Sequence, residues 1–453
     1  MEVRVSTGIT ERRGLLGKER ALEVADRVIG QSPGDLTEVV MKGGVSTLTR
    51  FTENYIHQNV AEANQSISVK VIFGKRIGVA STNSLDDHSL RKVVEMAAQV
   101  ARLQEPNDDF EGIPEPEDIR ELDAFSDNTY AFSAMDRAAA VRTVIDQAKA
   151  KGFKAAGAFS TDAGELCVAN SLGVRAYHPS TTASVSTVVM SDTSSGYAEG
   201  RAIDVAEISA SEVGRKAAEK CAMGQHPVSI DPGEYEVILE PLAVADMLLY
   251  LAWMGFSAQA VRDGRSFVSG KLGQKLFSDL FTFWDDGLDA RGFPMPFDLE
   301  GVPKKKVTMV KDGVAGELVY DYKNARKEGK KPTGHGGFSG WGPMAVNLFM
   351  AGGPYSVEDM IKNTRRGILV TRFHYTNLAH PIRLLVTGMT RDGTFLIEDG
   401  VLTRPVKNLR FTESILRVFG TMDMVGKDMV KAGRTVAPAI RVPAFTFTGT
   451  TEF

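Results

Sequence analysis

Three histidines in the second half of the chain are the side chains best suited by type to do chemistry. His335 lies in the glycine-rich loop 333–342, and His374 and His380 lie between two stretches of β pattern. Imidazoles on loops over a rigid sheet suit metal binding or acid–base catalysis, because their charge changes near neutral pH. Nothing in the spacing sets their mutual distance, so ordinary hydrogen-bonded loop histidines are the favoured interpretation.

Two acidic pairs are the next candidates. Asp285 precedes Asp286, and Asp298 lies two residues before Glu300. Paired carboxylates can divide acid and base roles, but both pairs are flanked by turn-forming residues. We therefore interpret both pairs as solvated turn acids.

The local motifs that would indicate a cofactor or a familiar nucleophile are missing from the sequence. No GxGxxG or GxxxxGK[ST] is present to hold nucleotide phosphates, and no GxSxG is present to expose a serine nucleophile. None of the seven histidines forms an HExxH pair, which would place two imidazoles on one face of a helix. We expect no cofactor and no bound metal.

Composition narrows the class of protein further. The chain has 453 residues, of which 43% are hydrophobic, enough for large cores in more than one domain. Its net charge of −4 provides no basic field for a phosphate backbone, so direct nucleic-acid binding is not expected. Cys167 and Cys221 are isolated and suit a reducing compartment. The longest apolar run, residues 247–256, is about half of what a membrane-spanning helix needs. We predict a cytoplasmic protein without membrane segments.

The first half alternates between helical and strand patterns. Apolar residues recur at helical spacing, whereas polar and β-branched residues alternate in the strand segments. The main helices are predicted at 18–30, 87–103, 134–149 and 204–221, and the first strands at 46–57 and 66–73. An acidic, proline-containing stretch at 104–123 is predicted to be a solvated crossover. A layered α/β sheet domain satisfies this order.

The second half has a different pattern. A Pro- and Gly-containing segment, 224–233, predicts a boundary that divides the chain into domains 1–225 and 226–453. One long helix near 242–261 is followed by short β segments with five Asp-Gly pairs, which favour hairpin turns. We predict an α+β protein whose C-terminal domain is a curved antiparallel sheet or barrel around one buried helix.

Six segments of the chain resemble the TldD/TldE (PmbA) family, also called modulators of DNA gyrase and peptidase family U62. They are residues 48–59, 266–287, 297–336, 360–373, 393–415 and 424–429. None is a catalytic signature, but six in the same order over nearly the whole chain are specific. The resemblance implies an N-terminal α/β domain and a C-terminal domain dominated by β-strands.

The resemblance also implies a division of labour between two subunits. The TldD type is similar to a metallopeptidase with an HExxxH helix and a downstream cysteine, whereas the TldE type lacks these ligands and pairs with TldD. In this chain, the resemblance places the first histidine at Leu249, the glutamate at Tyr250 and the second histidine at Met254. These side chains can neither hold zinc nor take a proton from metal-bound water. The last cysteine, Cys221, lies upstream of this helix, so the chain resembles a TldE-type subunit.

This helix is apolar nearly all the way round, so we expect Trp253 and Met254 to be core residues. The resemblance implies a metal-free subunit whose partner is a TldD-like metallopeptidase and whose substrate is an unfolded or leader peptide. Two alternatives stay open. One is a stand-alone hydrolase that uses His335, His374 and His380, and the other is a non-catalytic interaction protein that forms a homodimer.

Overall fold

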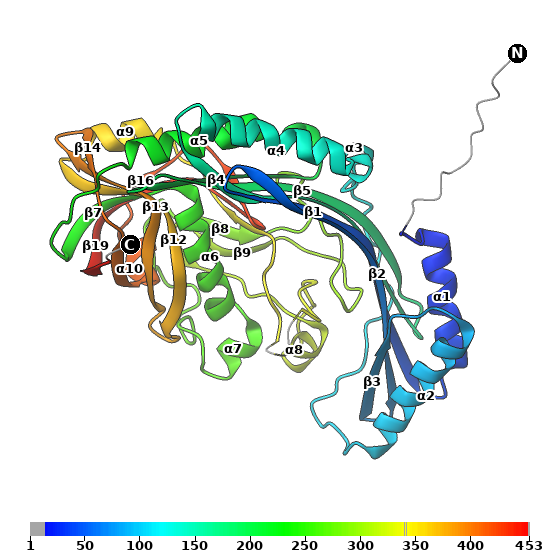
Figure 1. The fold of residues 1–453 in the computed structure, drawn as a ribbon. Coiled ribbons are helices and arrows are strands. Elements are labelled where there is room, and N and C mark those ends of the chain that lie inside the picture. The colour runs from blue at the N-terminus through cyan, green and yellow to red at the C-terminus, as the bar shows by residue number, and fades with distance from the viewer. Residues whose placement is uncertain (1–13, 339, 341, 452–453) are drawn as a thin grey trace, which may run out of the picture.

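The computed structural model describes residues 14–338, 340 and 342–451 and is built from three β-sheets with helices packed on and between them (Figure 1). The helices are α1 (Lys18–Gln31), α2 (Asp87–Leu103), α3 (Asp127–Ala131), α4 (Ala134–Lys149), α5 (Ala210–Met223), α6 (Pro241–Gly255), α7 (Ala258–Arg262), α8 (Tyr322–Lys327), α9 (Val357–Lys362) and α10 (Ile415–Thr421), with a 3-10 turn η1 (Val205–Glu207). The predicted α+β class is confirmed.

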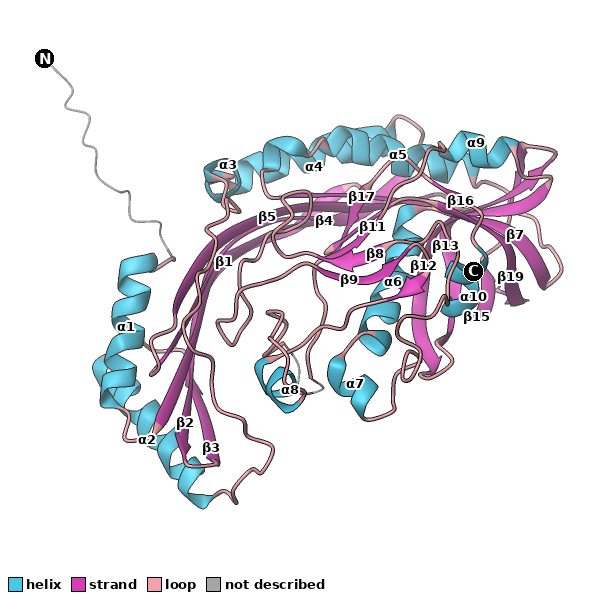
Figure 2. Ribbon diagram, turned by 180° about the vertical axis from the view of Figure 1, so that it is seen from behind, coloured by secondary structure: helices cyan, strands magenta, loops and turns pink. Residues whose placement is uncertain are grey.

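The first sheet has six antiparallel strands in the order β3-β2-β1-β4-β5-β6. These strands are β1 (Leu36–Thr52), β2 (Tyr55–Phe73), β3 (Arg76–Thr82), β4 (Lys154–Asn170), β5 (Arg175–Met190) and β6 (Ser195–Ala202). The long strands form an arch (Figure 1). Helices α1 to α5 lie on its convex side, and the C-terminal half of the chain lies beneath its concave side (Figure 2). The arch therefore shelters the face where the two halves of the chain meet.

Helix boundaries in this region follow from amphipathic periodicity and side-chain caps. The predictions at 87–103 and 134–149 coincide with α2 and α4. Asp86 accepts hydrogen bonds from two backbone N–H groups at the start of α2, and Ser133 forms a capping box with Asp136 at the start of α4. These caps satisfy donors that the first helical turn leaves unpaired.

The strand predicted at 46–57 is instead a hairpin, because Glu53 and Asn54 form a turn between β1 and β2. Their φ angles are 49° and 64°, the left-handed conformation of a two-residue type I′ turn. The Asn54 amide donates to the Phe153 carbonyl at 2.9 Å, and its Oδ1 accepts from Ala155 N–H at 2.7 Å. These contacts to β4 hold a turn that lacks glycine.

The C-terminal half contains two further sheets. One has the strand order β10-β9-β8-β11-β18-β17. The other contains five strands in the order β12-β7-β19-β15-β13, and pairing of β12 with β13 closes them into a barrel. The strands are β7 (Gly233–Leu239), β8 (Phe283–Asp285), β9 (Val307–Lys311), β10 (Val314–Ala315), β11 (Leu348–Met350), β12 (Arg366–His380), β13 (Leu385–Glu398), β14 (Val401–Pro405), β15 (Leu409–Ser414), β16 (Met424–Val425), β17 (Val430–Ala432), β18 (Thr435–Ala437) and β19 (Ile440–Thr450). The expected β-rich domain is confirmed.

Only some of the Asp-Gly pairs form hairpin turns. Asp312-Gly313 joins β9 to β10 and Asp399-Gly400 joins β13 to β14, each with positive φ at both residues. The other pairs end α7, follow β8 and lie inside β13, at residues 263–264, 286–287 and 392–393. The dipeptide allows the left-handed geometry, but the flanking segments decide whether it is adopted and whether two strands pair across it.

The helix predicted over 242–261 is divided into α6 and α7. Val319 N–H donates to the Phe256 carbonyl at 2.9 Å, and Ala258 N–H donates to the Val319 carbonyl at 3.1 Å. A distant strand-like segment therefore takes the backbone groups that would have continued the helix. Helix α6 packs between barrel strands β7 and β12 on one side and β17 and β18 on the other.

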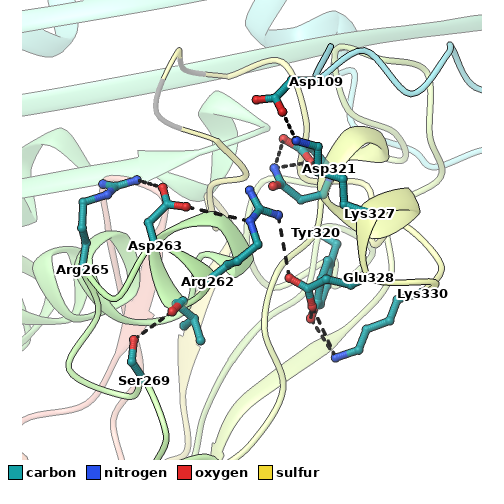
Figure 3. Close-up of polar contacts among 12 residues, drawn as sticks. Asp109, Arg262, Asp263, Arg265, Ser269, Tyr320, Asp321, Lys327, Glu328 and Lys330 are labelled. Carbon is teal, nitrogen blue, oxygen red and sulfur yellow. Dashed lines mark hydrogen bonds and ion pairs between the residues drawn. The ribbon is translucent and has the colours of Figure 1, made fainter.

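Polar contacts gather around α8 beneath the arch, and one of them connects the two halves of the chain. Asp109, in the crossover predicted to be solvated, forms an ion pair with Lys327 of α8 (Figure 3). Nearby, Arg262 at the end of α7 lies 3.9 Å from Glu328, which accepts a 2.8 Å hydrogen bond from the Tyr320 hydroxyl. These contacts are exposed or half-buried, so each contributes little to stability. None of the helices in the described ranges is long and apolar enough to cross a membrane.

Packing of α6 predicts a large stability difference between two leucine variants. Leu248 is fully buried, whereas Leu103 at the end of α2 is 85% exposed. Leu248→Ala should lower the free energy of unfolding by about 2–5 kcal/mol, because it removes buried methyl groups and leaves a cavity. Leu103→Ala should change it by less than about 0.5 kcal/mol. Urea unfolding followed by circular dichroism measures both, and equal losses would contradict this assignment of the core.

Candidate functional site

The exposed side of α6 forms the floor of a groove. Ala243, Val244, Met247, Leu248 and Leu251 face the core with at most 1% exposure, so burial occupies one side of the helix. The opposite side presents residues at helical spacing to a cavity of about 490 Å³. They are Leu242, Asp246, Leu249 and Trp253. The cavity walls come from β6, β12, the segment 344–348 and the turn between β17 and β18.

One wall of the groove contains an arginine, Arg372, whose charge is paired with that of Asp392. Arg372 Nε donates to Asp392 Oδ2 at 2.7 Å, and Ser195 Oγ donates to Asp392 Oδ1 at 2.6 Å. The Arg372 guanidinium also lies 4.1 Å from the ring centroid of Tyr197, whose hydroxyl donates to Glu199 at 2.5 Å. The Arg372 charge is therefore compensated by Asp392, and hydrogen bonds and a cation–π contact tie the polar side chains of this wall together.

Asp246 is the carboxylate on the groove side of α6. It is partly buried and accepts a hydrogen bond from the Thr376 hydroxyl of β12. Burial raises the pKa of Asp246, while the Thr376 hydrogen bond and the Arg372 charge oppose the increase. The carboxyl therefore holds a proton more readily than an exposed aspartate does.

The three positions that the family resemblance assigns to metal ligands lie along this helix. Leu249 lines the groove, the Tyr250 hydroxyl donates to the Thr376 carbonyl at 2.7 Å, and Met254 packs partly buried against the core. None of these side chains supplies an imidazole or a carboxylate. In the part of the chain that the structure describes, no three His, Cys, Asp or Glu residues are grouped to hold a metal ion. The donor set on α6 does not fit zinc.

The prediction that Trp253 is a core residue is wrong. Its side chain is 38% exposed at the edge of the groove, and its ring packs edge-on against Tyr250 with centroids 6.4 Å apart. The apolar pattern of α6 indicates burial all round, but neighbouring elements cover only one side. Apolar side chains therefore form a groove surface at this position.

The three candidate histidines lie in different surroundings. His335 is fully buried, with Nε2 2.8 Å from Asp285 Oδ1 and Nδ1 2.9 Å from the Thr333 hydroxyl. His374 and His380 both belong to β12, where His380 is exposed and accepts from Arg383 N–H at 3.3 Å. Among the described residues, no hydrogen bond or ring contact joins His335 to either of them. A shared three-histidine centre stays a prediction.

The prediction that the acidic pairs are solvated is wrong for Asp285 and Asp298. Both are completely buried. Asp285 Oδ2 accepts from Val346 and Asn347 N–H, each at 2.7 Å, and Asp298 accepts from three backbone N–H groups, including Gly336 at 2.7 Å. Distant loops replace water at these carboxylates, which local turn residues cannot reveal.

Charge around Asp285 is balanced inside the protein. Burial alone would raise the pKa of Asp285, but the Lys304 ammonium, His335 and Asn347 N–H hold it at about 2. Burial and Lys304 lower the pKa of His335, so this imidazole is neutral near pH 7. The Asp285 carboxylate therefore fixes segment 344–348, which forms a wall of the groove.

A second cavity, of about 240 Å³, lies between the arm of the arch and α8. Glu38, Lys70, Glu300 and Asp321 line it, and Lys70 pairs with Glu38 at 2.5 Å. Glu300 accepts from Tyr322 N–H at 2.9 Å. Burial, followed by the charge of Asp298, raises the pKa of Glu300 to about 8. Its carboxyl therefore holds a proton to higher pH than an exposed glutamate does.

Comparisons with known proteins agree with this architecture. Family models for PmbA/TldA metallopeptidase domain 1, the central domain and the C-terminal domain match residues 37–101, 114–223 and 232–449. The metalloprotease PmbA of Escherichia coli O157:H7 is 24% identical over 447 residues, which cover 93% of this chain and 94% of that protein. A metalloprotease TldD homologue from Buchnera aphidicola is 29% identical over 181 residues, or 39% of this chain and 37% of that protein.

A solved structure has a similar fold. The crystal structure of TldE from Thermococcus kodakarensis superposes with a TM-score of 0.87 at 21% identity. The match covers 95% of this chain and all of that one. At this identity the likeness establishes the fold alone.

The raised pKa of Glu300 predicts a pH-dependent stability. Because its folded pKa is near 8 and its ordinary value is 4.5, the folded state binds more protons between these pH values. The stability that protonated Glu300 gives to the folded state is complete below about pH 4.5 and is lost as the pH rises to about 8. The loss is about 1.4 kcal/mol for each unit by which the folded pKa exceeds the unfolded pKa. Glu300→Gln should therefore lose less stability than wild type between pH 5 and pH 8.5 in urea unfolding.

The matched control is Glu117→Gln, which removes an exposed carboxyl from the acidic crossover. This variant should follow the wild-type curve. A Glu300→Gln variant with the wild-type pH dependence would show that the carboxyl is ionised in the folded state.

Proposed function

Because the chain belongs to the PmbA/TldD metallopeptidase family, we propose that it is a metal-free, TldE-like subunit that pairs with a TldD-like zinc metallopeptidase. In this pair the partner supplies the metal and the water that it activates. This chain helps to enclose the unfolded or leader peptide that is cleaved. It is not catalytic alone.

The observation that carries the proposal is the chemistry of the groove side of α6. A groove of about 490 Å³ is present, but its floor has Leu249 where the resemblance places the first histidine. Tyr250 and Met254 replace the glutamate and the second histidine. A groove that has no metal donors on its floor can still contact a peptide as one wall of the space in which the peptide is enclosed.

The arch supplies a second surface that an extended peptide or a partner could use. Strand β3 pairs with residues 67–73 of β2, so the outer edge of residues 55–66 has no strand partner in the described ranges. An unpaired edge offers backbone N–H and C=O groups to any extended segment, whatever its sequence. This property supports binding of unfolded chains of varied sequence.

Purification of the chain alone and with a TldD-like partner tests the division of labour. The isolated chain should contain much less than one zinc ion per molecule and should not cleave an unfolded reporter peptide. The pair should contain zinc on the partner and cleave the peptide. The control is a partner whose HExxxH glutamate is replaced by Gln, which should abolish cleavage although the pair still forms. Zinc-dependent cleavage by the isolated chain would refute the proposal.

The same preparation decides between heterologous pairing and a homodimer. Light scattering on the isolated chain gives its mass, and mixing with the partner should shift that mass to the heterologous pair. A homodimer that does not exchange with the partner would support the alternative of an interaction protein.

Variants of the groove floor test its contact with peptide. Trp253→Ala and Leu249→Asp remove or reverse apolar surface that lines the groove, so the pair should cleave the reporter at least tenfold less efficiently, through a raised KM. Met135→Ala is the control, because Met135 is 77% exposed on α4, on the convex side of the arch. Unchanged KM in both groove variants, with the pair intact, would contradict the assignment of the peptide surface to α6.

A further inference from the structure

A third cavity, distinct from the one beside α8, lies next to the α6 groove, across the ion pair of Arg372 and Asp392. Its volume is about 560 Å³, and its walls come from the turn between β5 and β6, the loop after α5, the middle of β13 and the segment 405–408. Ser195 and Asp392 line this cavity, whereas Arg372 and Tyr197 line the groove. The ion pair of Arg372 with Asp392 therefore separates two distinct sites.

Two cations in this cavity have no counter-charge. Arg391 and Lys407 both line the cavity and are half-buried. In the described ranges, neither side chain has a hydrogen bond or an ion pair, although most other half-buried cations of the protein do. A cation that is partly withdrawn from water without an acceptor is unfavourable unless a ligand supplies one.

The acids of the cavity do not compensate these charges. Asp392 already forms an ion pair with Arg372, which compensates its charge, and its other oxygen accepts a hydrogen bond from Ser195. Asp192 lies exposed at the rim. Because Asp392 is paired with Arg372, the two cations of the cavity face only one unpaired acid among its described residues, Asp192, although the whole chain has a net charge of −4.

The rim also has polar groups in a fixed arrangement. His226 has a left-handed backbone, with φ 56°, and its N–H donates to the Thr193 hydroxyl at 3.2 Å. For a non-glycine residue this conformation costs on the order of 1 kcal/mol and persists only where its surroundings hold it. His226 lines the same cavity as the two cations.

The remaining wall limits what the ligand can be. One part of it is aliphatic, with Val188, Met190, Pro405 and Val406, and the rest consists mostly of glycine and of hydroxyl and amide side chains. Among the described residues, His226 is the only aromatic side chain that lines the cavity, so stacking on a nucleobase is not favoured. We propose that this cavity binds a compact oxyanion, a carboxylate or a phosphate, on a short aliphatic body. The Arg391 guanidinium binds the anion through paired N–H groups, Lys407 supplies a second charge, and the aliphatic wall holds the body of the ligand.

Calorimetry on the isolated chain tests this site without the partner subunit, so the result does not depend on the proposed division of labour. The probes are inorganic phosphate, butyl phosphate, a Val-Ala-Val tripeptide with a free carboxyl end, and the same tripeptide with an amidated end. We expect saturable binding of at least one anionic probe, weakened by salt, and no binding of the amide. Preference for the free-acid tripeptide identifies a peptide carboxyl end as the ligand, and preference for the phosphates identifies a phosphate ester.

The double variant Arg391→Gln with Lys407→Gln should weaken binding of the preferred probe at least tenfold. The matched control is Arg410→Gln, since Arg410 is exposed on β15 and does not line the cavity. Without ligand, the double variant should melt at or above the wild-type temperature, because two uncompensated charges are removed. Absence of binding by every probe, undiminished binding by the double variant, or a lower melting temperature of that variant would overturn the proposal.

Discussion

Burial of one side of α6 is the constraint on which the C-terminal half depends. This helix has few polar side chains, and its core-facing residues are almost completely removed from water. Each Å² of apolar surface so buried stabilises the fold by roughly 25 cal/mol. A single sheet cannot cover this side. The barrel therefore packs against it from one direction, and the sheet that contains β17 and β18 packs against it from another. The groove is the strip of α6 that these two sheets leave uncovered.

Buried charges then hold the walls of the groove in place. Asp285 binds segment 344–348 through two backbone N–H groups, and Asp392 binds both Arg372 and Ser195. Breaking either arrangement would leave a buried charge without a partner, which is strongly unfavourable. The same rule applies to Arg391 and Lys407, because neither has a hydrogen-bond acceptor among the described residues, although both line a cavity.

Local patterns predicted those parts of the fold that depend on local physics. Helices α2 and α4 follow from amphipathic spacing and from caps within a few residues, so their bounds could be predicted. The hairpin at Glu53 and Asn54 was missed because its geometry is held by β4, about 100 residues away. The break between α6 and α7 was missed for the same reason, since Val319 provides the competing hydrogen bonds.

Residue type alone determined what the groove side of α6 cannot do. Leu249, Tyr250 and Met254 provide no pair of imidazoles in any conformation, so the lack of zinc donors at these positions is a property of the sequence. Only the tertiary structure decided that Trp253 is exposed, that Asp285 and Asp298 are buried, and that Arg391 and Lys407 share one cavity. The physical reason is that coordination chemistry belongs to a side chain, whereas burial and charge compensation depend on segments that are distant in sequence and meet only on folding.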